Sequence, residues 1–304
     1  VERAIAVTES QQALRQQLES LDDLQSIVQT MKALAAASIR QYEQAVEALR
    51  LYERSVEMGL GVVLRRDGMS YLQSETLARP RANGCIAIVF GSDHGLCGRF
   101  NEQVVDHAKN DLAERTSQAD QTAVLTVGMR AAGQLASQNV PVHKQFVLPP
   151  NAQEITARVQ DILQWIDARR RQQSPREVVV YANQPGEGAD AAPIARTLLP
   201  LDLQHFQDLG RYQWPSRRQP VAFMDTHTLA SSLIRQHLFV QLFQACAGSQ
   251  ASEQASRLSA MQSAESSLDE RVDWVTNRHR RLRQNAITAE LLDIVAGFEA
   301  TQSE

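Results

Sequence analysis

The fold of this chain is decided by its C-terminal quarter, which reads LSAMQSAESSLDERVDWVTNRHRRLRQNAITAELLDI over residues 258–294. Its apolar residues recur mostly every three or four positions, the spacing that places side chains on one face of a helix. The stretch from Asp225 to about Ala300 contains no proline and only two glycines. A helix of about 70 residues would be about 105 Å long. Because a compact domain needs no such length, we expect its apolar stripe to pack against another long element.

A second helical pattern occupies residues 8–66. Its apolar positions run from Leu14 to Leu60, and the small residues at 33–37 allow a partner helix to approach closely. All ten prolines of the chain lie between residues 80 and 220, which leaves both ends free of helix breakers. The two ends therefore predict an antiparallel coiled coil. Since their apolar positions do not follow strict heptads, we expect the pairing to be imperfect.

The middle of the chain alternates strand-like and helix-like segments. The apolar run Cys85–Phe90 is typical of a strand that is buried on both faces. Further strands are expected at 123–127, 140–146 and 177–181, and helices at 101–115, 128–138 and 152–171. This alternation predicts an open, mostly parallel α/β sheet. Residues 184–220, rich in proline and glycine, are assigned to strand or loop. The predicted domains are an N-terminal helix (1–70), an α/β domain (83–220) and a C-terminal helix (225–304).

Composition excludes several classes of protein. The net charge of −4 and the pI near 6.0 argue against a nucleic-acid-binding protein. The three cysteines have no metal-ligand spacing, so reduced thiols and no metal site are expected. No apolar run approaches the length of a membrane span, and the N-terminus shows neither a secretory signal nor a transit peptide.

A glycine-rich turn, GSDHGLCGRFN at residues 91–101, follows the first predicted strand. Such a turn at the carboxyl end of a strand could cradle a phosphate. It lacks both common phosphate-loop patterns, however, and has no lysine to reach a phosphate. Asp93, His94 and Cys97 also lack the arrangement expected of a nucleophile and its base. A tight strand-to-helix turn is the favoured interpretation, and no catalytic residue or cofactor is predicted.

The densest positive run is RHRRLR at residues 278–283. Within a helix it spreads around the surface, so one interpretation is a solvated helical face. The other is a positive collar that faces an acidic partner. Nucleic acid is the weaker choice because aromatic residues do not interleave with the run.

Taken together, these segments resemble the gamma subunit of F-type ATP synthases, the central rotor shaft. Three blocks carry the resemblance: residues 20–40 with their alanine-rich neck, the turn SDHGLCG at 92–98, and residues 251–297, which begin ASEQA and include Arg257 and Met261. Their order and spacing agree with the family over the whole chain. The resemblance implies a coiled coil of the end helices and a Rossmann-like middle domain without a nucleotide.

The resemblance also implies partners and a location. The coiled coil would sit inside a ring of alpha and beta subunits. The middle domain would stand on the c-subunit ring beside the epsilon subunit. Ion flow would turn the c ring and the shaft, which forces the beta subunits through their nucleotide states. The chain itself would be non-catalytic and peripheral, on the cytoplasmic face of the bacterial plasma membrane.

Family roles can be carried to three sets of matching residues. Contact with the beta-subunit catch loop is expected from Arg283, Gln284, Thr288 and Glu290. Neck or coiled-coil positions are Met31, Ala35, Ala36, Arg40, Leu282, Ile287, Leu291 and Ile294. Positions in the foot near the c ring and epsilon are Asp93, Gly95, Leu96, Cys97, Gly98 and Asn101. For Met31, Leu282 and Ile287, simple packing within the coiled coil is an equal alternative.

The sequence departs from the family pattern at several positions. Arg280 replaces a common asparagine, Arg99 and Phe100 replace a common Gly-Leu, and the end of the chain is less apolar than usual. These departures suit a divergent branch such as the sodium-linked relatives. Two other functions stay open: an α/β enzyme with a ligand at 91–98 and helical arms, and a coiled-coil adaptor.

Overall fold

The computed structural model describes most of the chain. The described residues are 2–63, 84–115, 122–173, 175, 177–185, 191–202 and 224–302. The chain divides into two compact units. The terminal unit comprises Val1–Leu34 and Leu258–Glu304, and the central unit comprises Ala35–Arg257.

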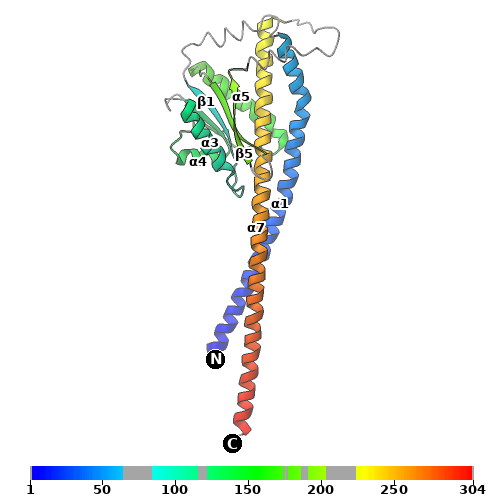
Figure 1. The fold of residues 1–304 in the computed structure, drawn as a ribbon, viewed down its shortest axis with the longest axis vertical. Coiled ribbons are helices and arrows are strands. Elements are labelled where there is room, and N and C mark those ends of the chain that lie inside the picture. The colour runs from blue at the N-terminus through cyan, green and yellow to red at the C-terminus, as the bar shows by residue number, and fades with distance from the viewer. Residues whose placement is uncertain are drawn as a thin grey trace. The chain divides into compact units, whose positions relative to one another are not determined.

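Two helices, α1 (Glu2–Val63) and α7 (Thr226–Gln302), form the ends of the chain (Figure 1). Neither contains a proline, so neither loses a backbone N–H within its ladder. At the start of α7, Asp225 accepts hydrogen bonds from the Thr228 backbone N–H at 3.1 Å and the Thr228 hydroxyl at 3.2 Å. This side-chain cap satisfies a helix N-terminus, and the bond from the Thr228 N–H is the main cause that lowers the pKa of Asp225. The long helices predicted at both ends are confirmed.

The buried side of α1 follows strict heptads, which corrects the prediction of an imperfect stripe. Partly or fully buried positions recur at alternating steps of four and three: Leu14, Leu18, Leu21, Gln25, Val28 and Lys32 in the terminal unit, then Ala35, Ile39, Tyr42, Val46, Leu49, Glu53, Val56, Leu60 and Val63 in the central unit. The apolar stripe looked irregular because polar residues occupy three of these positions. Such spacing is that of a coiled-coil seam.

The same spacing appears on α7 within the terminal unit. Its partly or fully buried positions are Met261, Glu265, Leu268, Val272, Val275, His279, Leu282 and Ala286. Here Gln25 donates to the Asp269 carboxylate at 2.6 Å, and Lys32 pairs with Glu265. Both polar seam residues of α1 in this unit therefore have a partner on α7.

The α1 and α7 segments also pair within the central unit. The Tyr52 hydroxyl donates to Gln236 at 2.6 Å, and Gln244 donates to Glu53 at 2.7 Å. In the terminal unit the partner on α7 falls from Asp269 to Glu265 as α1 rises from Gln25 to Lys32. In the central unit it falls from Gln244, beside Glu53, to Leu233, which lies against Gly59. The pairing is therefore antiparallel, and the predicted antiparallel coiled coil is confirmed.

The central unit contains a five-stranded sheet in the order β3-β2-β1-β4-β5. Its strands are β1 (Cys85–Phe90), β2 (Thr122–Val127), β3 (Lys144–Phe146), β4 (Glu177–Pro185) and β5 (Ala191–Leu199). The first four are parallel and β5 is antiparallel to β4. The mostly parallel sheet is thus confirmed. β3 is shorter than the strand predicted at 140–146. The Val140 N–H donates to the Leu135 carbonyl at the end of α4, and Pro141 has no N–H to donate. The predicted segment 184–220 is described only in part.

Helices cover both faces of the sheet. These helices are α3 (Phe100–Arg115), α4 (Met129–Ser137) and α5 (Ile155–Gln173), the last preceded by a 3-10 turn, Ala152–Glu154. All six residues of β1 are buried. Its side chains alternate between a core formed with α3 and α4 and a second core formed with α5 and α7. Figure 1 shows these helix pairs on opposite sides of the sheet.

The first third of α7 is a structural layer of the central unit. Leu238, Leu242 and Cys246 are buried in the same core as Ile88 of β1 and Ile162 of α5. This packing stabilises the contact between α7 and the sheet through van der Waals attraction and the burial of apolar surface. Within the described ranges, no helix combines the length and apolarity that a membrane crossing requires.

Candidate partner-binding surfaces

The turn after β1 is closed by its own side chains. The Asn101 amide donates to the Ser92 hydroxyl at 2.7 Å, and its carbonyl accepts from the Ser92 N–H at 2.9 Å. The Ser92 hydroxyl donates to the His94 carbonyl at 2.7 Å. Cys97 is buried beside them, and burial is the main cause that raises the pKa of its thiol. A buried thiol with a raised pKa is a poor nucleophile. The hydrogen bonds among Ser92, His94 and Asn101 hold the turn in place, which favours a structural role for it.

Asp93 links this turn to two other loops. Its carboxylate accepts from the backbone N–H of Met129, the first residue of α4, at 2.8 Å. The other oxygen accepts from the N–H of Leu148 at 2.8 Å. The carboxylate thus places a negative charge at the N-terminus of α4, where the helix dipole and the unpaired N–H groups favour an anion. Of the residues predicted for the foot, Asp93, Cys97 and Asn101 come together here, whereas the Leu96 side chain is exposed.

Two glycines allow these loops to approach one another. A Cβ on Gly91 would lie 2.3 Å from the Cβ of Ala131, and Gly128 has a φ of +121°. A Cβ on Gly128 would lie 2.8 Å from the carbonyl carbon of Gly91. Neither position can therefore accept a side chain without movement of the backbone.

We expect Gly91→Ala to lower the free energy of unfolding by about 2–3 kcal/mol, because the added methyl group overlaps Ala131. Gly133→Ala is the matched control, since Gly133 lies in α4 with open space around it. That control should be stabilising by about 0.5–1 kcal/mol through helix propensity. Urea unfolding of the full chain measures both changes. Equal stability of the two variants would contradict the close packing at Gly91.

A buried ion pair joins the turn to α7 within the central unit. Arg257 donates to the Glu253 carboxylate at 2.7 Å and to the Gly95 carbonyl at 3.2 Å. The two side chains are only 10% and 5% exposed. Burial raises the pKa of Glu253, and the nearby Arg257 guanidinium opposes that rise. The i, i+4 spacing of this pair can be read from the sequence. The contact of Arg257 with the turn after β1 cannot, because that turn is distant in the sequence.

The distal part of α7 exposes the residues predicted to meet the beta subunit. Arg283, Gln284, Thr288 and Glu290 are all exposed. The Thr288 hydroxyl donates to the Gln284 backbone carbonyl at 3.0 Å, and the Gln284 side-chain amide forms no hydrogen bond with a described residue. Arg283 forms no ion pair with a described side chain. These four residues can therefore offer charged and amide groups to another protein.

Large apolar side chains are also exposed along this part of α7. Ile287, Leu291 and Ile294 are 47%, 58% and 68% exposed, and Leu292 and Val295 are exposed beside them. An exposed apolar stretch of this size is typical of a protein-binding surface. The exposure favours a partner over internal packing for Ile287, whereas Leu282 is partly buried in the seam. Among the predicted neck residues, Ala35 is buried, Met31 is half-buried, and Ala36 and Arg40 are exposed.

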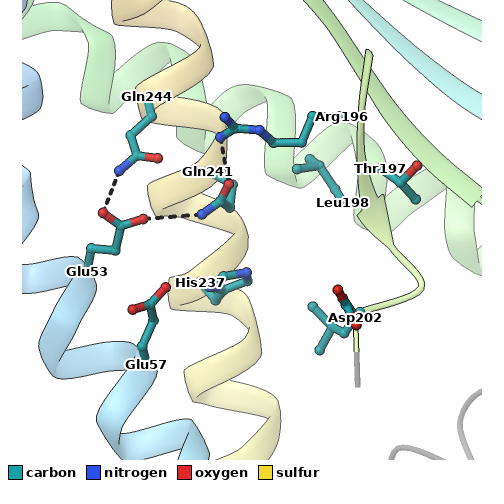
Figure 2. A pocket seen from close by; sticks show the side chains of 10 residues that line it. Glu53, Glu57, Arg196, Thr197, Leu198, Asp202, His237, Gln241 and Gln244 are labelled. Atoms are coloured by element: carbon teal, nitrogen blue, oxygen red, sulfur yellow. Dashed lines mark hydrogen bonds between the residues drawn. The ribbon is translucent and has the colours of Figure 1, made fainter. Parts of the chain in front are cut away.

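The central unit also contains a cavity that was not predicted from the sequence. It has a volume of about 380 Å³ and lies between α1, β5 and α7 (Figure 2). In it Arg196 donates to Gln241 at 2.8 Å, and Gln241 and Gln244 both donate to Glu53. Because these residues come from three distant segments, no local motif could identify them. Their polar groups largely satisfy one another, and no potential metal-ligand cluster exists among the described residues.

The comparisons with known proteins agree with this architecture. Residues 10–301 match the family described as ATP synthase. The ATP synthase gamma chain of Anaeromyxobacter sp. (strain Fw109-5) is 26% identical over 293 residues, which cover 94% of this chain and 97% of that protein. The gamma chain of Nitrosomonas eutropha is 26% identical over 297 residues, with coverage of 96% and 99%.

Two solved structures have the same fold. The first is in the Euglena gracilis mitochondrial ATP synthase, OSCP/F1/c-ring, rotational state 3; it has a TM-score of 0.63 and 15% identity and covers 97% of this chain and 96% of its own. The second is in the Tetrahymena thermophila mitochondrial ATP synthase, central stalk/c-ring, with a TM-score of 0.54, 22% identity and coverage of 78% and 99%.

The coiled coil of terminal helices joined to a Rossmann-like domain is a fold that this chain shares with the two ATP synthase structures above. The chain belongs to the ATP synthase family, and its curated relatives are gamma chains. Its role is that of the gamma subunit, as the resemblance in the sequence predicted.

Proposed function

We propose that this chain is the rotor shaft that couples ion-driven rotation of a c ring to the nucleotide states of the beta subunits. The observation that carries the proposal is the antiparallel pairing of α1 and α7 through heptad seams in both units. A helix pair of this kind resists bending and twisting better than a single helix, because its side chains interlock. A shaft needs this stiffness and needs no active site.

The proposed partners are alpha and beta subunits around the distal part of α7, and epsilon and the c ring beside the turn 92–101. The exposed apolar stretch at 287–295 supports the first contact. The anchoring of the turn by Asp93 and Arg257 supports the second, because a turn that receives force must be held firmly. The chain would thus act as a non-catalytic, peripheral subunit on the cytoplasmic face of the bacterial plasma membrane.

The proposed mechanism is differential contact. The helix pair presents charged, apolar and polar faces at different angles, so chemically identical beta subunits around it would meet different surfaces. Binding energy that differs between states is what couples distant sites. Rotation of the pair would therefore impose a different nucleotide state on each beta subunit in turn.

The division into a helix at 1–70, a domain at 83–220 and a helix at 225–304 is part of this proposal.

Co-expression with the alpha and beta subunits of the same organism tests the proposal. We expect a stoichiometric complex whose ATP hydrolysis rate falls at least tenfold when this chain is left out, because the catalytic sites then lose their coupling. Size-exclusion chromatography and a coupled ATPase assay measure the two results. A chain that stays separate from both subunits would contradict the proposal. Saturable micromolar binding of a nucleotide to the full chain would favour an enzyme instead.

A further inference from the structure

One feature of α7 in the terminal unit has no part in the contacts described so far. Trp274 is 43% exposed, and two arginines lie over its ring. The guanidinium carbon of Arg271 is 4.5 Å from the ring centroid and that of Arg278 is 5.2 Å away. These are cation–π distances. The two positive charges are therefore held within about 10 Å of each other on one indole ring.

Helix geometry places these residues on one stripe. Steps of three, four and three residues connect Arg271, Trp274, Arg278 and Arg281, so all four lie on the same side of α7. We call them the Arg–Trp stripe. Each lies one position before a seam residue, which places the stripe along the flank of the helix pair. Across the seam, the heptad places Gln17, Leu24 and Met31 of α1 on that flank, and none of them is acidic.

The arginines of the stripe have no carboxylate partner among the described side chains. No ion pair joins Arg271, Arg278 or Arg281 to a described acidic residue. No acidic residue occurs three or four positions from any of the three, the separations at which helical side chains meet. The nearby Glu270 and Asp273 likewise form no ion pair within the described part. Positive charge is thus concentrated on this stripe in a chain whose net charge is −4.

We propose that the Arg–Trp stripe binds an acidic segment of the alpha or beta subunits that surround α7, through carboxylates on that segment. This inference rests on the proposed function and adds a contact to those expected at Arg283 and Gln284. Stacking on an indole orients a guanidinium while its N–H edge stays free, and that edge matches a carboxylate in a bidentate geometry. Pre-ordering the arginines also reduces the side-chain entropy that binding would cost.

The stripe faces away from Arg283 of the expected catch-loop contact but lies beside Gln284. Arg283 is five residues beyond Arg278, about 140° further around the helix at 100° per residue, whereas Gln284 is three residues beyond Arg281. Arg283 and the stripe can therefore meet different partner side chains at the same time. The sequence predicted a positive collar at 278–283 without an aromatic residue. Trp274 was not considered part of it because it lies four residues before the run.

The test compares arginines on opposite faces of α7. Arg271→Gln/Arg278→Gln removes two charges from the stripe, and the single variant Arg278→Gln has Arg280→Gln as its matched control. Arg280 is exposed and lies about 160° away from Arg278 around the helix. Trp274→Leu removes the ring and keeps both charges. All positions are exposed and glutamine is a good helix former, so circular dichroism should show unchanged helix content.

Assembly of each full-length variant with the alpha–beta subcomplex is measured by surface plasmon resonance at 50 mM and 500 mM salt. We expect the double variant to associate about tenfold more weakly at low salt, and the difference to shrink at high salt as the charges are screened. Arg278→Gln should lose more than Arg280→Gln, and Trp274→Leu should fall between wild type and the double variant.

Three outcomes separate the possibilities. Wild-type chain that does not assemble overturns the proposed function, and the inference with it. Wild-type chain that assembles, with a double variant that equals Arg280→Gln, overturns only the inference. Binding of single-stranded DNA that the double variant alone loses, with assembly unchanged, would show that the stripe serves nucleic acid and would also overturn it.

Discussion

Arg257→Leu is expected to lower the free energy of unfolding by about 3–5 kcal/mol at pH 7, because it leaves the Glu253 carboxylate buried without its cation. The variant also loses the hydrogen bond to the Gly95 carbonyl, which frees the turn after β1 from α7. Urea unfolding of the full chain, followed by circular dichroism, measures the loss.

The pH dependence of this variant identifies the cause. Burial raises the pKa of Glu253, and Arg257 lowers it again in the wild type. Without Arg257 the folded-state pKa rises further above the unfolded value. Since the folded state then binds the proton more tightly, stability increases as the pH falls through the raised pKa and is lost as the pH rises through it. The deficit of Arg257→Leu should therefore shrink when the pH is lowered from 8 towards the ordinary carboxyl range.

The double variant Glu253→Gln/Arg257→Leu is the control, because it removes both charges and keeps a polar side chain at 253. It should recover most of the lost stability and show little pH dependence. If Arg257→Leu were as stable as wild type at every pH, the pair would carry no structural role. The foot of the proposed shaft would then need another anchor.

Arg283→Ala/Gln284→Ala is expected to reduce the ATPase rate of the reconstituted complex about 10- to 100-fold while the complex still assembles. Losing a charge-assisted hydrogen bond costs about 1.5–3 kcal/mol, which corresponds to this range of rates if the contact acts in the rate-limiting state. Both side chains are exposed, so the stability of the isolated chain should not change.

The matched control is Asn277→Ala/Arg280→Ala, which truncates an amide and an arginine that are exposed on the same helix. It should retain most of the activity. The ATPase rate at saturating ATP and size-exclusion chromatography distinguish loss of coupling from loss of assembly. Equal rates for the two double variants would contradict the proposed catch-loop contact.

The two long helices and the buried strand β1 were predictable from the sequence because the patterns that indicate them are local. The absence of proline outside residues 80–220 determines where uninterrupted helix can form. The apolar run of β1 predicts burial on both faces, and both faces are covered. Each such signal lies within one segment, so no knowledge of tertiary contacts is needed.

The seam was misjudged because it is partly polar. Gln25, Lys32 and Glu53 occupy heptad positions, and a search for apolar spacing passes over them. Their burial depends on acidic or amide partners about 190 to 240 residues away on α7. Similarly, the antiparallel strand β5 has few fully buried residues, so its pattern was weak. Pairing over such distances is decided by tertiary structure.

The candidate surfaces were only partly accessible from the sequence. The turn at 92–98 and the distal helix could be located through the family resemblance. The contacts of Asp93 and the contact of Arg257 with Gly95 could not be predicted, because the partners are backbone groups of other loops. The contacts assigned to Arg283, Gln284, Thr288 and Glu290 stay predictions until they are measured in a complex.

The unbroken heptads also limit how the gene can change. One codon inserted near residue 29 would rotate the two parts of α1 by about 100° relative to each other. If one part kept its place against α7, the other would lose it, so either Leu21 or Ala35 would leave the interface. Insertions and deletions should therefore be rare within the two long helices and common between the strands. Relatives whose helices differ in length should differ by whole heptads, with matching changes on both helices.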